Sequence, residues 1–317
     1  MRPRIEVVAA VLQRPDGSFL LAQRPTGKVY AGYWEFPGGK IESGEAAAAA
    51  VARELHEELG IEVEEAYPWI VRDYDYEHAA VRLRFYRVTR WSGDLHGKEQ
   101  QAFAWQRIEQ LTVEPLLPAN GPILRALALP TLYGITNAAA VGTDVFLRRL
   151  EAALAGGWRL IQVREKALAD DALRAFVSRT CTLAHERHAK VLVNAEPSLA
   201  VQARADGVHL TSARLMAATR RPDCALVGAS CHDTRELAHA AALGLDFVVL
   251  GPLGETQSHP GAPTLGWGRF SELIADYPLP VYAIGGLSAA DLPAAWAAGA
   301  HGIAAIRGAW GLEEVTR

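Results

Sequence analysis

Eight short apolar runs recur along the second half of the chain, and they constrain its fold more than any other feature. Seven segments separate the runs, and each holds a helical pattern, which is clearest in DVFLRRLEAALAGG and DDALRAFVSRTCTLAHERH. Near-continuous apolar strands that alternate with helices indicate a parallel sheet covered on both faces, and eight of them predict a compact (β/α)8 TIM barrel. The runs are LYGIT, LIQVRE, VLVNA, GVHL, LVGASC, FVVLGP, VYAIGG and GIAAIR.

The length of 317 residues predicts two domains, because single hydrophobic cores stop growing at about 250–300 residues. The stretch PANGPILRALALP combines prolines with a short apolar helical pattern, and we interpret it as a short linker. We therefore place one α/β domain at residues 1–129 and the barrel at residues 131–317.

Strand and helix patterns alternate in the first domain as well. A Pro-Gly-Gly turn and a charged loop precede an alanine-rich helix, which is expected to begin near Ala46 and to stop at Gly60. Apolar alternation and β-branched residues predict strands at Glu6–Leu12, Phe19–Gln23, Val81–Thr89 and Ala102–Gln106.

Charge and composition exclude several classes of partner. The net charge is −4 and both halves are slightly acidic, so no basic face for duplex nucleic acid is expected. Three cysteines without metal-like spacing are typical of a reducing cytosol. No apolar run reaches membrane-spanning length, and Glu6 interrupts the first run, which we interpret as a strand and not as a signal peptide. We expect a cytoplasmic protein with no membrane partner; the oligomeric state stays open.

The stretch RELHEELG, residues 53–60, crowds three carboxylates onto one face of the predicted helix. They belong to Glu54, Glu57 and Glu58. Apolar residues every four positions form the buried stripe beside them, so the carboxylates lie together on the adjacent side. Converging carboxylate oxygens suit a hard cation such as Mg²⁺ or Mn²⁺, and Arg53 is placed to hold Glu54. A solvated acidic surface is the alternative reading of the same spacing.

The surrounding residues decide between these readings, because Gly39 to Ile61 resembles the Nudix box. That pattern is Gly, five residues, Glu, seven residues, then Arg-Glu-apolar-any-Glu-Glu-any-Gly-apolar, and this chain fulfils every position. The resemblance implies a Nudix α/β/α sandwich with a mixed sheet. It also implies hydrolysis of a nucleoside diphosphate linked to another group, with the three glutamates as metal ligands. Which carboxylate acts as the base stays open.

A closer resemblance, to MutT-type 8-oxo-dGTP diphosphatases, rests on EFPGGKIE, on RW followed by GKE, and on LLPANGPI. It implies that Glu99 is a further metal ligand and that Asn120 hydrogen-bonds the purine edge, since an amide both donates and accepts. It also implies a phosphate and nucleotide site formed by Arg24, Phe36, Gly38, Gly39 and Lys40. The chain departs from the MutT-type pattern at one place that affects base selectivity: those proteins often have an arginine near the position of Ala79.

Polar residues cluster at the ends of the predicted barrel strands, where such barrels carry their active sites. AIGG and AIRG follow strands seven and eight, the common place for phosphate. We predict a phosphate-binding set of Gln162, Arg164, Lys166, Asn194, Ser230, Thr256, Ser258, Gly285, Gly286 and Arg307.

These barrel segments resemble the thiamine phosphate synthase and thiazole tautomerase superfamily. LYGIT, IQVREK, GASCH, LGP, AIGG and GAHGIAAI follow that superfamily's order. Synthases carry an Asp where this chain has Ala195, another where it has TSA at 211–213, and a Lys where it has His259. Because those carboxylates hold a Mg²⁺-pyrophosphate substrate, we predict that synthase activity is lost. His232 is a candidate general acid/base for a thiazole phosphate, and a packing role is its alternative.

The sequence thus supports three hypotheses. The first is a Mg²⁺-dependent Nudix pyrophosphohydrolase that cleaves 8-oxo-dGTP to 8-oxo-dGMP and pyrophosphate, which would sanitise the nucleotide pool and serve DNA repair. The second is a hydrolase of thiamine-pathway pyrophosphates whose barrel binds or isomerises a thiazole phosphate. The third treats the barrel as a non-catalytic module that senses a phosphorylated, thiamine-related ligand.

Overall fold

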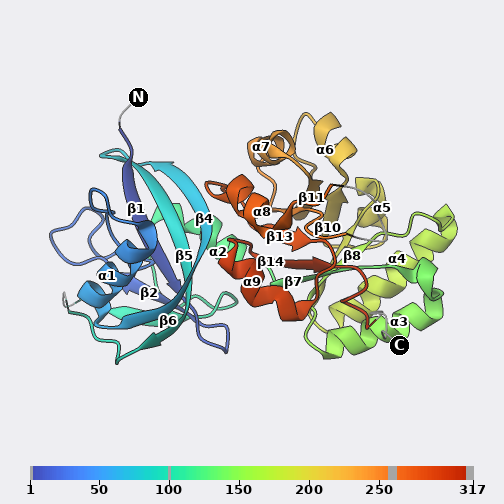
Figure 1. Ribbon diagram of the computed structural model, residues 1–317. Coiled ribbons are helices and arrows are strands. Elements are labelled where there is room, and N and C mark those ends of the chain that lie inside the picture. The colour runs from blue at the N-terminus through green and yellow to red at the C-terminus, as the bar shows by residue number, and fades with distance from the viewer. Residues whose placement is uncertain (1–2, 99–100, 256–262, 312–317) are drawn as a thin grey trace. The chain divides into compact units, whose positions relative to one another are not determined.

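The computed structural model describes residues 3–98, 101–255 and 263–311 (Figure 1). The chain forms two compact units, one of Met1–Ala128 with Ala275–Pro278 and the other of Leu129–Ile274 with Leu279–Arg317. Within the described ranges, no helix is both long and apolar enough to cross a membrane.

Two small sheets make up the frame of the first unit. In one sheet β1 (Ile5–Leu12) pairs parallel with β5 (Ala80–Ser92), which pairs antiparallel with β4 (Glu62–Asp75). The other sheet is antiparallel and joins β3 (Trp34–Glu35), β2 (Phe19–Gln23) and β6 (Phe103–Gln106). The unit therefore has the mixed strand directions that the Nudix resemblance implies.

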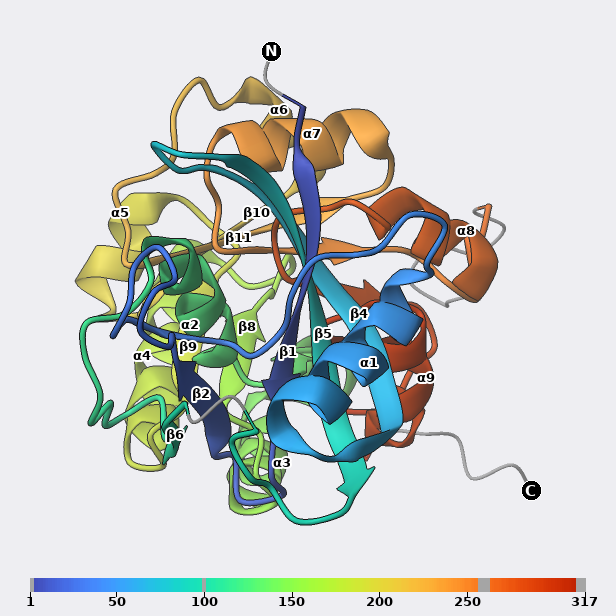
Figure 2. The same ribbon diagram turned by 90° about the vertical axis from the view of Figure 1, so that its left-hand side faces the viewer.

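Strand β1 separates two hydrophobic layers, because successive side chains of a strand point to opposite faces. Val8, Ala10 and Leu12 pack with α1 (Ala47–Leu59), which Figure 2 shows lying over this sheet. Ala9 and Val11 pack on the other side with α2 (Gly121–Leu127), which follows the 3-10 turn Pro118–Asn120. The result is the expected α/β/α sandwich.

The second unit is a closed barrel of eight parallel strands. The strands are β7 (Leu132–Ile135), β8 (Leu160–Val163), β9 (Lys190–Val193), β10 (Gly207–Leu210), β11 (Leu226–Cys231), β12 (Phe247–Leu250), β13 (Val281–Ile284) and β14 (Gly302–Ala305). They follow one another in chain order, and β14 pairs with β7 to close the ring. The predicted fold class is confirmed, and each predicted apolar run overlaps one of these strands.

Helices surround the barrel strands in Figure 1. They are α3 (Thr143–Ala155), α4 (Asp170–His185), α5 (Pro197–Gln202), α6 (Ser212–Ala217), α7 (Thr234–Ala242), α8 (Gly266–Ile274) and α9 (Leu292–Ala297), with 3-10 turns at Ala138–Ala140 and Ala289–Asp291. The barrel interior is filled by large side chains, and Tyr133, Phe247 and Tyr282 lie fully buried in it. The barrel is thus a packed core with its site at one end.

Sequence patterns missed two strands of the first unit. β4 contains Pro68 and five acidic residues, and its pairing with β5 shifts register at three places, so it shows no regular alternation. β3 has only two residues, which is too short to produce a periodic signal. Both strands depend on pairing with distant partners, which a local pattern does not reveal.

Candidate functional site

The acidic face of α1 is positioned by its buried stripe and its C-terminal cap. Val51, Leu55 and Leu59 are almost fully buried in the core, so the helix cannot turn about its axis. Gly60 ends the helix with φ of 72°, a left-handed conformation that favours glycine. Glu54 and Glu58 are consequently held half-buried beside the core, while Glu57 is exposed.

Arg53 ties the surrounding carboxylates together. Its Nε and Nη2 donate to the two oxygens of Glu45 at 2.9 and 3.0 Å, a bidentate pair. Its Nη1 donates to Glu54 at 2.9 Å and to Glu57 at 3.1 Å, and Nη2 also donates to the carbonyl of Lys40 at 3.0 Å. The Glu45 hydrogen bond raises the pKa of Arg53 and lowers that of Glu45. Arg53 therefore fixes the side of α1 that carries the glutamates.

Two glutamates of the face are disposed to hold protons when no cation is near. Burial, followed by the charge of Glu35, raises the pKa of Glu58 to about 8. Burial also raises the pKa of Glu54, against the effect of Arg53. Glu35 itself has its pKa raised by burial, although Arg24 donates to it. These shifts show three carboxyl groups that share a small, poorly solvated space.

Backbone atoms of the Pro-Gly-Gly turn complete this space. The N–H of Gly38 donates to Glu58 Oε2 at 3.2 Å, and Gly38 has φ of 146°, where a side chain would be strained. A Cβ on Gly39 would overlap the Glu54 carboxylate. The two glycines therefore let the turn approach the helix face closely.

The donor chemistry of this face fits a hard divalent cation. Half-buried carboxylate oxygens that raise one another's pKa are relieved when a cation replaces the protons. No ready cluster of three metal-ligating side chains occurs in the parts of the chain that the structure describes, and the predicted ligand Glu99 lies outside them. Glu54, Glu57 and Glu58 carry the carboxylate oxygens of this face.

The predicted nucleotide-contacting residues are not all equally placed. Asn120 is buried, and its Nδ2 donates to the carbonyl of Trp34 at 3.3 Å, which leaves its oxygen for another donor. Arg24 is engaged by Glu35 and by the carbonyl of Val29, and Lys40 is exposed. Phe36 corrects the prediction: its side chain is 3% exposed and packs on Phe19 and Phe85 in the core.

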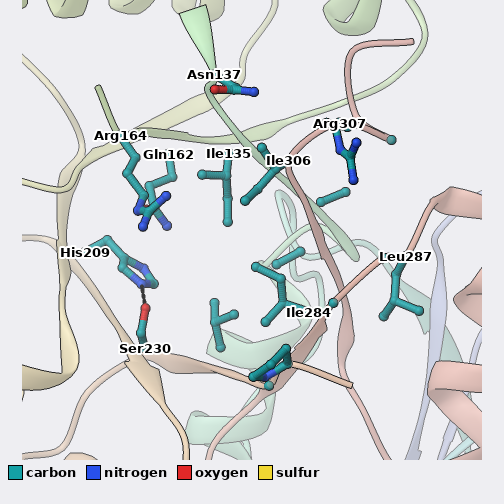
Figure 3. Close-up of a pocket in the computed structure, with 18 of the residues that line it drawn as sticks. Ile135, Asn137, Gln162, Arg164, His209, Ser230, Ile284, Leu287, Ile306 and Arg307 are labelled. Atoms are coloured by element: carbon teal, nitrogen blue, oxygen red, sulfur yellow. Dashed lines mark hydrogen bonds between the residues drawn. The ribbon is translucent and has the colours of Figure 1, made fainter. Parts of the chain in front are cut away.

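The barrel carries a second candidate site, a cavity of about 740 Å³ at the ends of its strands (Figure 3). Gln162, Arg164, Ser230, His232, Gly285, Gly286 and Arg307 are predicted residues that line it. Lys166 is exposed and is not among the described lining residues. Asn194 is not among them either, but Asn194 Nδ2 donates to Gln162 Oε1 at 3.2 Å. Thr256 and Ser258 lie outside the described residues.

The charge of the cavity wall is positive. Arg164 and Arg307 approach from opposite sides in Figure 3, and the described lining includes no Asp or Glu. Burial lowers the pKa of Arg164, so a bound anion would stabilise its charge. This wall suits a phosphate group.

A metal ion does not fit this mouth as it would in a synthase. Ala195 has no ligand atom in its side chain, and Ser212 donates its hydroxyl proton to Glu236. The neighbouring Glu196 points to Arg214, whose Nη2 lies 2.7 Å from its carboxylate. The loop after β9 and helix α6 are therefore joined by an ion pair, and the described lining of the cavity includes no carboxylate.

A buried hydrogen-bonded chain crosses the barrel beneath the cavity. Gln162 Nε2 donates to Tyr133 Oη at 3.1 Å, Tyr133 Oη lies 3.2 Å from His209 Nδ1, and His209 Nε2 lies 2.9 Å from Ser230 Oγ. Burial, followed by the charge of Arg164, lowers the pKa of His209 to about 3. His209 is therefore neutral at ordinary pH.

The thiol of Cys231, which lines the cavity, is a poor nucleophile. Burial raises the pKa of Cys231 well above its usual range, and Cys231 lies between Ser230 and His232 at the end of β11. A thiol that stays protonated is a poor nucleophile. Cys231 thus serves as a small packing residue.

Comparison with known proteins assigns both units. The profile of the thiamine monophosphate synthase family matches residues 132–309, and that of the NUDIX domain matches residues 3–127. The chain belongs to both families as a fusion.

Each half of the chain has relatives that it matches over nearly their whole length. The Nudix domain is 42% identical to a CTP pyrophosphohydrolase of Escherichia coli over 38% of this chain and 90% of that protein. It is 32% identical to an 8-oxo-dGTP diphosphatase of the same organism over 39% of this chain and 96% of that protein. The barrel is 34% identical to a putative thiamine-phosphate synthase 2 of Aquifex aeolicus over 57% of this chain and 97% of that protein. The Nudix domain is accordingly a hydrolase.

Three residues of the two sites escaped the sequence analysis. Glu35 lies in EFPGG, where a lone acidic residue next to a turn gave no spacing signal. His209 stands inside the apolar run GVHL, and a polar residue in such a run was the signal that could have found it. Glu236 follows His232 by four residues, a helical spacing that allows contact.

Proposed function

We propose that the Nudix domain hydrolyses a nucleoside triphosphate to the monophosphate and pyrophosphate, with 8-oxo-dGTP as its preferred substrate. The observation that supports the proposal most is the Arg53 clamp, because it holds Glu45, Glu54 and Glu57 around the Pro-Gly-Gly turn. Such a network preorganises carboxylates for a metal-bound triphosphate.

The residues of this domain have separate parts to play in the reaction. A bound Mg²⁺ or Mn²⁺ would neutralise phosphate oxygens and make the attacking water more acidic. Glu54, Glu57 and Glu58 would hold the ion, while Gly38 donates its N–H to Glu58 and fixes that carboxylate. Glu54 and Glu58 are the two partly buried carboxylates of this face and are the candidates for receiving a proton from water.

Purine preference is assigned to Asn120. One N–H of its Nδ2 donates to the Trp34 carbonyl, so its second N–H and its oxygen are left to pair with a base edge, and the oxygen can accept from an N–H of the base. An 8-oxopurine carries an N–H at position 7 where guanine has an acceptor. A site that offers an acceptor therefore selects the oxidised base over dGTP.

A second candidate substrate is CTP, since the CTP pyrophosphohydrolase is 42% identical and the 8-oxo-dGTP diphosphatase 32%. The exocyclic amino group of cytosine is also a donor, so Asn120 alone does not separate the two. Ala79 stands near the position where MutT-type relatives often have an arginine, so a contact that could distinguish the bases is missing here. Hydrolysis of CTP and of 8-oxo-dGTP therefore has to be compared directly.

A substrate panel with Mg²⁺ tests the proposal. We expect kcat/KM for 8-oxo-dGTP to exceed that for dGTP and CTP, and Asn120→Ala to reduce the value for 8-oxo-dGTP more than that for dGTP. Equal turnover of 8-oxo-dGTP and dGTP would refute the sanitising role. Faster turnover of CTP would assign the second candidate, and faster turnover of thiamine diphosphate would assign the domain to thiamine-pathway pyrophosphates.

For the barrel we propose metal-independent binding of a phosphate monoester, without synthase activity. Support comes from the two arginines of the cavity and from the lack of a carboxylate in its described lining. Thermal shift of the full chain in EDTA with inorganic phosphate tests this, because a ligand of the folded state raises its melting temperature. A shift that requires Mg²⁺ would contradict it.

A further inference from the structure

The end of β11 presents two polar residues to the barrel cavity, Ser230 and His232. Each is hydrogen-bonded on one side to a partner that is itself held by further residues. These partners decide which of the two residues donates a hydrogen bond to a ligand and which one accepts a hydrogen bond from it.

Ser230 is the end of the buried chain that begins at Gln162. Tyr133 Oη accepts from Gln162 Nε2, so its single proton donates to His209 Nδ1. A neutral imidazole has one donor and one acceptor nitrogen, so His209 Nε2 carries its proton and donates to Ser230 Oγ. Ser230 Oγ has no other hydrogen bond among the described residues, so its own proton is left for the cavity, and Figure 3 shows the bond between His209 and Ser230.

His232 is held in the opposite sense by Glu236. One oxygen of Glu236 accepts from the backbone N–H of His232 at 2.7 Å and lies 3.0 Å from His232 Nδ1. A carboxylate only accepts, so Nδ1 carries a proton, and in the neutral imidazole Nε2 is left as an acceptor.

Glu236 cannot easily turn away from this role. Its side chain is 13% exposed, its other oxygen accepts from the hydroxyl of Ser212, and its backbone N–H donates to Asp233 Oδ1 at 2.8 Å. The hydroxyl of Ser212 therefore holds the second oxygen of the Glu236 carboxylate.

We propose that His209 and Glu236 are positioning residues that fix opposite hydrogen-bonding roles in the cavity: Ser230 Oγ–H as a donor and His232 Nε2 as an acceptor. Together with Arg164 and Arg307, the pair selects a phosphate monoester whose other end carries an acceptor atom beside a donor. This inference rests on the phosphate-monoester binding proposed for the barrel and does not depend on the Nudix activity.

Nitrogen-15 NMR of the full chain tests the two tautomers directly. We expect the Nε2–H form for His209 and the Nδ1–H form for His232. Glu236→Gln keeps an acceptor oxygen and should keep the His232 form, whereas Glu236→Ala should release it to the Nε2–H form that free histidine prefers. The Nδ1–H form at His209, or an unchanged His232 in folded Glu236→Ala, would overturn the assignment.

A matched pair of ligands tests the consequence for selectivity. The probes are 2-(pyridin-2-yl)ethyl phosphate, which has a ring acceptor, and phenethyl phosphate, which lacks one. Both are titrated in EDTA and followed by the signals of His209 and His232, so that binding elsewhere is not counted. One hydrogen bond predicts that the pyridyl ester binds roughly 2–10-fold more tightly, and that Ser230→Ala removes this preference.

The outcomes separate clearly. A preference that is lost in Ser230→Ala supports the donor role of Ser230. Equal affinities in the wild type, or a preference that survives Ser230→Ala, would overturn it. Failure of both esters to bind would overturn the ligand class, whatever the Nudix domain hydrolyses.

Discussion

Acid should destabilise the barrel through His209. The side chain is 1% exposed, and burial lowers its pKa from 6.5 to about 3. In the unfolded chain the imidazole binds a proton near pH 6.5, while in the folded chain it stays neutral. The unfolded state thus gains protons as pH falls, and the free energy of unfolding falls with it between pH 6.5 and 3.

The magnitude follows from the two pKa values. Each pH unit within this window changes the free energy of unfolding by about 1.4 kcal/mol, so a fall from pH 7 to pH 5 costs about 2 kcal/mol. That is a large fraction of the stability of an ordinary domain, roughly 5–15 kcal/mol.

Pulse proteolysis of the full chain in urea, read by mass spectrometry of barrel peptides, measures the effect in the barrel alone. His209→Gln is the matched variant, because glutamine can still accept from Tyr133 and donate to Ser230 but does not titrate. We expect the barrel of His209→Gln to lose about 2 kcal/mol less than the wild type between pH 7 and pH 5. Equal losses in both proteins would refute the buried, neutral histidine.

Three further predictions concern the Nudix domain. Arg53→Lys removes the bidentate contact with Glu45, so kcat/KM should fall about 10–100-fold. The control is Arg90→Lys, because Arg90 is an exposed residue of β5 that pairs with Glu64 of β4, and this change should alter kcat/KM little. Gly39→Ala should abolish most hydrolysis in a folded protein, because its Cβ would displace the Glu54 carboxylate; Gly268→Ala, where nothing lies within 4 Å, should be silent. Excess EDTA should stop nucleotide hydrolysis but leave phosphate binding to the barrel unchanged, as isothermal titration of the same sample would show.

The fold could be predicted from the sequence where patterns are local. The eight barrel strands are short apolar runs with helical segments between them, and α1 has a regular stripe that ends at Gly60. β4 could not be predicted, because Pro68 and its glutamates obscure the alternation and pairing with β5 decides its structure. Local patterning thus described the barrel better than the Nudix sheets.

The candidate sites show the same limit. Spacing alone placed Glu54, Glu57 and Glu58 on one helix face, because residues three and four apart share a face. It could not show that Phe36 turns into the core, since neighbours in a turn can point either way. Nor could it show that Ser212 turns to Glu236, because that contact joins two loops of the barrel.

The most direct test of the account measures pyrophosphate release from nucleotide with Mg²⁺ in Glu54→Gln, beside Glu62→Gln as the control. Glu54 is held by Arg53 on the acidic face, whereas Glu62 is an exposed residue at the start of β4 that pairs with His56. We predict that Glu54→Gln lowers kcat at least about 100-fold and weakens the dependence on Mg²⁺, while Glu62→Gln behaves as the wild type. Nearly unchanged hydrolysis by folded Glu54→Gln would contradict the assignment of the metal-binding face.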